Sequence, residues 1–125
     1  MKTIVTVESF DEMAARKLER ARKFDRGEAI VPERRISFER AEDMFAFLTG
    51  PRADVLRATI AKPRSITELA SALNRNRSAV SRDVRALREH GMVTVKRQVN
   101  PGHGQVAVVK AAAKRFELRA QIIAA

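Results

Sequence analysis

Apolar residues recur at the spacing of an α-helix in two short stretches near the middle of the chain. The first stripe consists of Ile66, Leu69, Ala70 and Leu73. Ser65, followed three residues later by Glu68, has the pattern of a capping box and predicts the start of this helix. The second stripe consists of Val80, Val84 and Leu87. Asn76 can cap this second helix, and Gly91 can end it in the left-handed conformation.

The side of the second helix opposite its apolar stripe is polar and basic. It carries Ser78, Arg82 and Arg85, with Ser81 beside them. Arginine can bond O6 and N7 of guanine together, and serine can bond several base edges or a phosphate. A solvated basic helix face has the same composition. The capped helix before it and the strand pair after it favour insertion of the second helix into a DNA major groove.

After Gly91 the apolar pattern changes to the alternation that is typical of β-strands. One run extends from Met92 to Val99 and a second from Val106 to Val109, and the turn residues 100–105 lie between them. This pattern predicts a β-hairpin. The tip residues that could reach phosphates or the minor groove are Lys96, Arg97, Asn100, His103 and Gln105. Arg75 and Arg77, at the start of the second helix, are expected to hold phosphates together with Lys96 and Arg97.

The N-terminal part of the chain predicts a strand followed by an amphipathic helix. Residues 3–7 have the composition of a short strand, and Ser9 with Glu12 begins the helix. Its apolar stripe consists of Phe10, Met13, Ala14, Leu18, Ala21 and Phe24. Ion pairs are expected at i,i+4, from Glu12 to Arg16 and from Glu19 to Lys23. The stripe is too wide for a free helix, so we expect it to dock on the rest of the chain, on a second copy or on a different protein.

Three further segments complete the pattern. Residues 36–38 are a candidate strand, residues 41–48 a short helix, and a helix that opens at Pro51 runs to about Lys62. This last helix is expected to bury Val55, Leu56 and Ile60. The tail is ambiguous, because residues 116–122 alternate like a strand while residues 109–123 also fit a helical stripe.

Charge is distributed unevenly along the chain. Residues 1–48 hold ten Lys and Arg against ten Asp and Glu, whereas residues 49–125 hold fifteen against five, so the whole net charge of +10 lies in the second part. Such confinement is the electrostatic signature of a site for a polyanion. There is no cysteine, which fits a cytoplasmic protein, and the two histidines are too few for a zinc site. No apolar run approaches the about 20 residues of a membrane span.

The order helix, helix, helix, hairpin is that of a winged helix-turn-helix. We therefore expect an α+β fold, mainly helical, with residues 1–48 as an N-terminal strand-helix extension and residues 49–125 as the DNA-binding domain. No constellation of catalytic residues meets the requirements of an active site, so we expect neither an enzyme nor a metal or cofactor site.

Residues 65–91 and the hairpin resemble the winged helix-turn-helix of MarR- and ArsR-like transcriptional regulators. The segments that carry this are SITELASAL and NRSAVSRDVRALREHGMV. With RISFERAEDMFAFLT and ADVLRATI they also resemble a little-characterised family of winged-helix regulators, over roughly residues 16–123. The resemblance implies a strand for residues 115–122. Because members are often encoded beside a toxin, it also implies an antitoxin role.

Two functions follow as expectations. The first is a homodimeric regulator that binds double-stranded DNA and places two recognition helices in successive major grooves about 34 Å apart. Residues 77–90 and 92–109 would be its recognition helix and wing. The alternative is an antitoxin that neutralises a protein toxin through residues 1–48 and autoregulates its operon.

Overall fold

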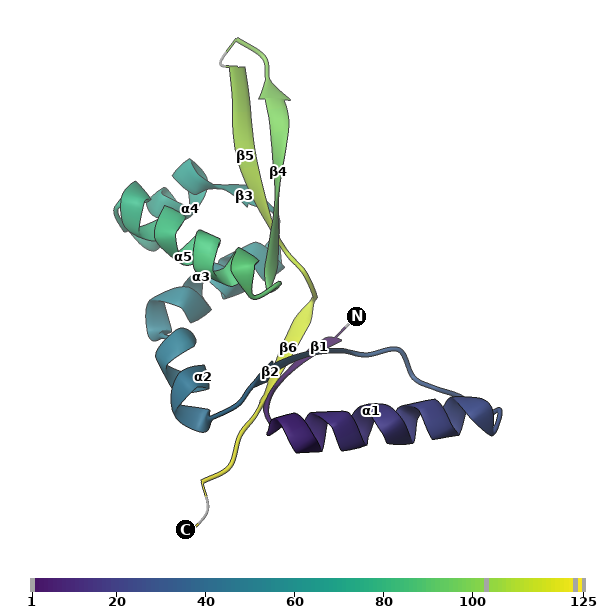
Figure 1. Ribbon diagram of the computed structural model, residues 1–125. Helices are drawn as coiled ribbons and strands as arrows, with labels where there is room; N and C mark the ends of the chain where they lie inside the picture. Colours follow the sequence, from purple (N-terminus) through teal and green to yellow (C-terminus); the bar gives the residue numbers. More distant parts are fainter. Residues whose placement is uncertain (1, 103, 123, 125) are drawn as a thin grey trace. The chain divides into compact units, whose positions relative to one another are not determined.

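The chain divides into two compact units (Figure 1). Unit 1 comprises Met1–Ala46 and Phe116–Ala125, and unit 2 comprises Phe47–Arg115. The structure, a computed structural model, describes residues 2–102, 104–122 and 124. The mixture of helices and strands confirms the expected α+β class.

Unit 1 is built on a three-stranded sheet in the order β2-β1-β6. Its elements are β1 (Lys2–Val7), α1 (Phe10–Asp25), β2 (Arg34–Phe38) and β6 (Arg115–Arg119). β1 and β2 are parallel, in a register that runs from Thr3 opposite Arg34 to Val7 opposite Phe38. Parallel neighbours need a crossover connection, and α1 provides it. β1 is the central strand, and its Ile4 and Val5 are buried.

The tail contains a strand, as the resemblance implied, but the strand ends at Arg119 and does not extend to residue 122. It forms β6 and joins the sheet beside β1, where Lys2 Nζ lies 2.9 Å from Glu117 Oε2. Ile123, which the helical alternative used, lies outside the described residues. Strand pairing therefore brings β6 into the sheet of unit 1, although the sequence pattern had grouped residues 49–125 into one expected DNA-binding domain.

The ends of α1 follow the sequence, but its ion pairs do not. Ser9 Oγ accepts a hydrogen bond from the Glu12 backbone N–H, and Gly27 follows the helix with a φ of +72°. The predicted i,i+4 pairs are replaced by others: Arg16 pairs with Glu8 at 2.8 Å and Glu19 with Arg26 at 3.5 Å. Arg16 reaches back to the strand end because Glu8 offers it both carboxylate oxygens.

Two helices follow β2 along the chain. They are α2 (Ala41–Phe47) and α3 (Gly50–Ala61). Thr49 caps α3, and Pro51 is its second residue, not its first. Val55 and Leu56 are buried as expected, but Thr59 is buried and Ile60 only half-buried. The Thr59 hydroxyl donates to the carbonyl oxygens of Val55 and Leu56, which offsets the cost of burying it.

Unit 2 has the arrangement of a winged helix-turn-helix, which confirms the predicted fold. After α3 come β3 (Arg64–Ser65), α4 (Ile66–Leu73), α5 (Arg77–Glu89), β4 (Val93–Asn100) and β5 (Gly104–Ala111). The three strands form a sheet in the order β3-β5-β4, in which β4 and β5 make the hairpin seen in Figure 1. Its largest fully buried side chains are Val55, Leu69, Val80, Leu87, Met92, Val93 and Val109. Among the described residues, no helix combines the length and apolar character of a membrane span.

Candidate nucleic-acid interface

The turn between α4 and α5 is fixed by its own side chains. Ser65 Oγ accepts from the Glu68 N–H at 3.1 Å and Glu68 Oε1 accepts from the Ser65 N–H at 3.2 Å, which completes the predicted capping box. These bonds lower the pKa of Glu68, first through the Ser65 backbone. Asn74 ends α4 in the left-handed conformation with a φ of 51°. Asn76 Oδ1 then accepts from the Ser78 N–H at 2.7 Å and caps α5.

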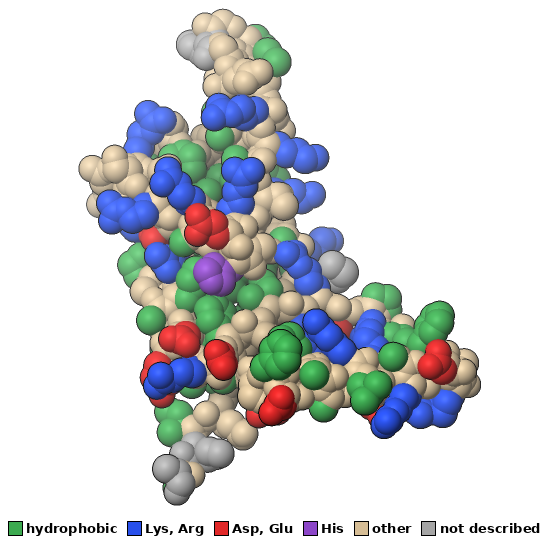
Figure 2. All heavy atoms as spheres, in the orientation of Figure 1, with side chains coloured by type: hydrophobic (Ala, Val, Ile, Leu, Met, Phe, Trp, Pro, Cys, Tyr) green, Lys and Arg blue, Asp and Glu red, His purple; other side chains and the backbone are tan. Residues whose placement is uncertain are grey.

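α5 separates an apolar side from a polar side as its sequence predicts. Val80, Val84 and Leu87 are buried in the core of unit 2. Ser78, Arg82 and Arg85 are exposed and Ser81 is half-buried. The apolar side therefore anchors the helix while the serine and arginine side chains stay accessible to a ligand. On the face drawn in Figure 2, Lys and Arg side chains gather over α4, α5 and the hairpin.

The one acidic residue in the middle of α5 is withdrawn from this surface. Asp83 is buried, and its two carboxylate oxygens face two different arginines. Arg75 Nη2 lies 2.7 Å from Oδ2 and Arg52 Nε lies 3.2 Å from Oδ1. Arg52 also donates to the Phe47 carbonyl oxygen and lies over the Phe47 ring, 5.0 Å from its centroid. The charge of Asp83 is thus balanced inside the protein, and the other acidic residue of α5, Glu89, is exposed at its last position.

The residues expected to hold phosphates fall into different environments. Arg77 is exposed at the first position of α5. Arg75 is only partly exposed because of its pair with Asp83, and its Nη1 is buried without a hydrogen-bond partner among the described residues. Lys96 and Arg97 are exposed on β4. His103 lies outside the described residues.

Strand alternation separates Lys96 from Arg97. Successive side chains of a strand point to opposite faces of the sheet, and directly paired residues share a face. Arg97 pairs with Ala107 and shares its face with Val93, Val95 and Val109, which turn toward the core of unit 2. Lys96 lies on the other face. The two cations therefore do not project from the same side of the wing.

Sequence reasoning missed three basic residues of unit 2. Arg52 was not expected near α5, because its pairing with Asp83 joins residues 31 positions apart. Arg88 is exposed in the last turn of α5, and Lys110 is exposed on β5. Arg88 and Lys110 could have been identified from the sequence, because both are basic residues on the predicted helix and hairpin strand. For Arg52 the local pattern held no signal.

Solved structures of other proteins resemble the chain. A protein from Methanosarcina mazei described as a possible transcriptional regulator is 24% identical, with 54% of this chain and 58% of that one covered and a TM-score of 0.48. Reduced HlyU from Vibrio cholerae is 22% identical, covered over 54% and 66%, with a TM-score of 0.47. The chain thus spans less than two thirds of each of these proteins.

A third structure covers more of the chain. It is the homodimeric winged helix-turn-helix DNA-binding domain of a possible ArsR-family regulator from Mycobacterium bovis, 17% identical, covered over 82% and 73%, with a TM-score of 0.49. No curated protein matches the sequence. The sequence model of the HVO_A0114 family matches residues 47–113, which is more than half of the chain, and the chain belongs to the HVO_A0114 family.

Proposed function

We propose that this chain is a transcriptional regulator that binds double-stranded DNA in a sequence-specific manner as a homodimer. α5 enters the major groove, where Ser78, Ser81, Arg82 and Arg85 read base edges. Arg77 and the wing residues Lys96 and Arg97 hold phosphates. His103, which lies outside the described residues, keeps its proposed role in DNA binding. The protein acts by binding and not by catalysis.

The observation that carries the proposal is the two-sided burial of α5. A buried apolar side fixes the helix, and the opposite side presents two exposed guanidinium groups and two hydroxyl groups. Asp83, which would repel phosphate, is neutralised by Arg52 and Arg75. This changes the expected task of Arg75: it shapes the surface by holding Asp83 and turns only part of its side chain to solvent.

The test is selection of binding sequences from random duplexes by the full chain, followed by affinity measurements on the selected duplex. Arg82→Ala or Arg85→Ala should weaken binding to the selected duplex by about 5- to 150-fold and weaken binding to random DNA much less. Arg57→Ala is a matched control, because it removes an exposed arginine of unit 2 that pairs with Asp54 on α3. Equal affinities of the wild-type protein for selected and random duplexes at physiological salt would overturn the proposal.

The antitoxin role is the second candidate. The feature that favours it is the exposed apolar face of α1, described below, which equally suits a second copy of this chain. Co-expression with a toxin encoded beside the gene tests the antitoxin role. Deletion of residues 1–30 should abolish rescue of growth while selected DNA is still bound, and rescue by the truncated chain would exclude this role.

A further inference from the structure

The apolar stripe of α1 is exposed in the folded chain. Phe10, Leu18 and Phe24 keep 73%, 53% and 72% of their surface accessible. None of the sixteen residues of α1, all of which the structure describes, is buried. The helix is instead tied to its unit by polar bonds, from Arg16 to Glu8 and from Arg20 to the Val31 carbonyl oxygen. Hydrophobic side chains recur along α1 on the face drawn in Figure 2.

The two aromatic ends of the stripe are placed symmetrically about Lys17. Phe10 and Phe24 are each seven residues from Lys17, or about 10 Å along the helix axis. Between them lie Leu18, which is 53% exposed, the half-buried Met13, and the small residues Ala14 and Ala21, which allow another helix to approach closely. If two copies of α1 pack antiparallel around a two-fold axis at Lys17, each Phe10 lies beside the Phe24 of the other copy. In such a two-fold interface, each copy contributes the same surface patch.

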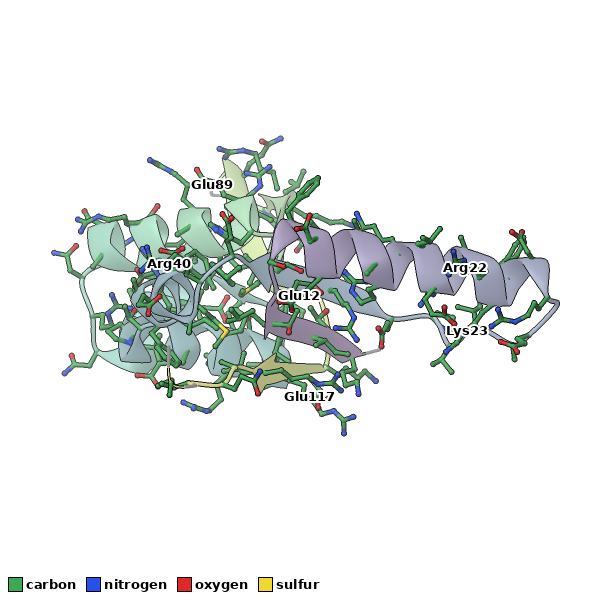
Figure 3. The ribbon with its side chains drawn as sticks, turned by 60° about the horizontal axis from the view of Figure 1, so that its bottom comes forward. Glu12, Arg22, Lys23, Arg40, Glu89 and Glu117 are labelled. Atoms are coloured by element: carbon green, nitrogen blue, oxygen red, sulfur yellow. The ribbon has the colours of Figure 1, made fainter. Side chains whose placement is uncertain are left out.

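Charge follows the same symmetry. The first turn of α1 is acidic and the last turn is basic, as the labelled Glu12, Arg22 and Lys23 in Figure 3 illustrate. At about 100° per residue, Asp11 and Arg22 fall on the same flank of the stripe. In the antiparallel arrangement Asp11 of one copy is within one residue of the level of Arg22 in the other. Parallel packing would instead place like charges together at both ends.

A shallow hollow of about 370 Å³ lies beside the C-terminal end of the stripe. Its lining residues are Lys17, Arg20, Ala21, Phe24, Asp25 and Ile30. In the antiparallel arrangement, Phe10 of the other copy lies at this position along the helix axis. An aromatic side chain that fills a hollow is the common anchor of a protein interface. Phe10 and the hollow are therefore a matched pair on the same surface.

We propose that the stripe Phe10–Phe24 of α1 is a self-association surface on which a second copy of this chain packs its own α1 antiparallel. The proposed function requires a second copy of this chain, and the surface named here is where that copy binds. The proposal rests on the proposed function only through this requirement for a dimer. Specific interfaces usually bury about 1,200 to 2,000 Å² in total, which two helices of this length do not reach, so we expect a dissociation constant in the micromolar range. The two Lys17 side chains meet at the axis and must turn their ammonium groups outward, which also weakens the dimer.

Sedimentation equilibrium of the full chain without DNA tests the surface. Phe10→Glu or Phe24→Glu should raise the dissociation constant by more than about tenfold, because each places a carboxylate in the apolar stripe twice per dimer. Phe45→Glu is the matched control, since Phe45 is 54% exposed on α2 and lies outside the stripe. A wild-type chain that stays monomeric to about millimolar concentration, or a dimer that the stripe variants leave intact, would overturn the proposal.

Charge exchange tests the antiparallel register. Asp11→Arg alone and Arg22→Asp alone should each weaken self-association by about tenfold, because two attractive pairs become repulsive. An equimolar mixture of the two variants should recover an affinity close to that of the wild type, since each arginine then meets an aspartate. No recovery in the mixture contradicts the register. Because these measurements contain no DNA, a failure to self-associate through α1 would not contradict the DNA-binding proposal. Equal affinities for selected and random duplexes would likewise not contradict self-association through α1.

Discussion

Arg75 Nη2 lies 2.7 Å from Asp83 Oδ2, so the arginine in the turn before α5 is paired with a carboxylate of α5 itself. Arg52 of α3 approaches the other oxygen of the same carboxylate. The three side chains join the helix-turn-helix to the helix before it. Removal of one member of a buried ionic group is costly, because the remaining charges stay buried without a partner.

Asp83→Ala should therefore destabilise unit 2 by about 3 kcal/mol, since it leaves two arginines uncompensated. Denaturant unfolding of the full chain measures the loss. Asp54→Ala is the matched control: it removes an aspartate whose pair with Arg57 is exposed, and such pairs contribute about 0 to 1 kcal/mol. A loss for Asp83→Ala no larger than that of the control would show that the pair of arginines does not stabilise the fold.

Arg75 and Arg77 should have opposite phenotypes, although both lie at the start of α5. Arg77→Ala should leave stability unchanged, weaken binding to selected and random duplexes alike, and reduce the salt dependence by about one unit. Arg75→Ala should mainly lower the free energy of unfolding, because its guanidinium neutralises Asp83. Fluorescence anisotropy at several salt concentrations and urea unfolding of both variants separate these effects. Equal salt slopes for Arg77→Ala and the wild type would exclude Arg77 as a phosphate contact.

Local signals predicted most of the helix-turn-helix. Ser65, Asn76 and Gly91 mark helix ends through bonds within a few residues, so their effect is visible in the sequence. The change from helical spacing to alternation after Gly91 likewise predicted the hairpin. These features depend on neighbours along the chain, and the structure retains each of them.

Contacts between residues far apart in the sequence could not be predicted from local patterns. No local pattern marks Arg52 as a partner of Asp83, because it reaches this carboxylate through packing of α3 on α5. The tail fitted two periodicities, and only its place beside β1 decides for a strand. Arg16 was assigned to Glu12 by spacing, but Glu8 offers both carboxylate oxygens and Ser37 also donates to it. Contacts between distant segments therefore account for most of what sequence reasoning missed.

Glu8 should make the attachment of α1 dependent on pH in the acid range. The hydrogen bond from Arg16 is the main cause that lowers the pKa of Glu8, followed in the same direction by the bond from Ser37. The carboxylate thus stabilises the folded state fully above its ordinary pKa of 4.5, and this contribution is lost as the pH falls through the lowered value. The protection factors of α1 amides, which correct for the intrinsic pH dependence of hydrogen exchange, should fall in that range.

Glu8→Gln should show the faster exchange already at neutral pH and lose most of the additional acid dependence. Glu12→Gln, on the same helix, is the control, because it removes a carboxylate and leaves Arg16 paired with Glu8. Exchange in Glu8→Gln that matches the wild type at neutral pH would show that the ion pair does not hold α1.

Alternation along β4 predicts that the two wing cations contribute unequally to DNA binding. Arg97 shares its sheet face with Val93 and Val95, which turn toward the helices of unit 2, whereas Lys96 points to the opposite face. A duplex held by α5 lies on the side of the helices, so Arg97→Ala should weaken binding more than Lys96→Ala does, by about 1 kcal/mol, as expected for a single phosphate interaction. Anisotropy titrations of both variants on one duplex measure this difference. A larger loss of affinity for Lys96→Ala would mean that the duplex meets the other face of the hairpin.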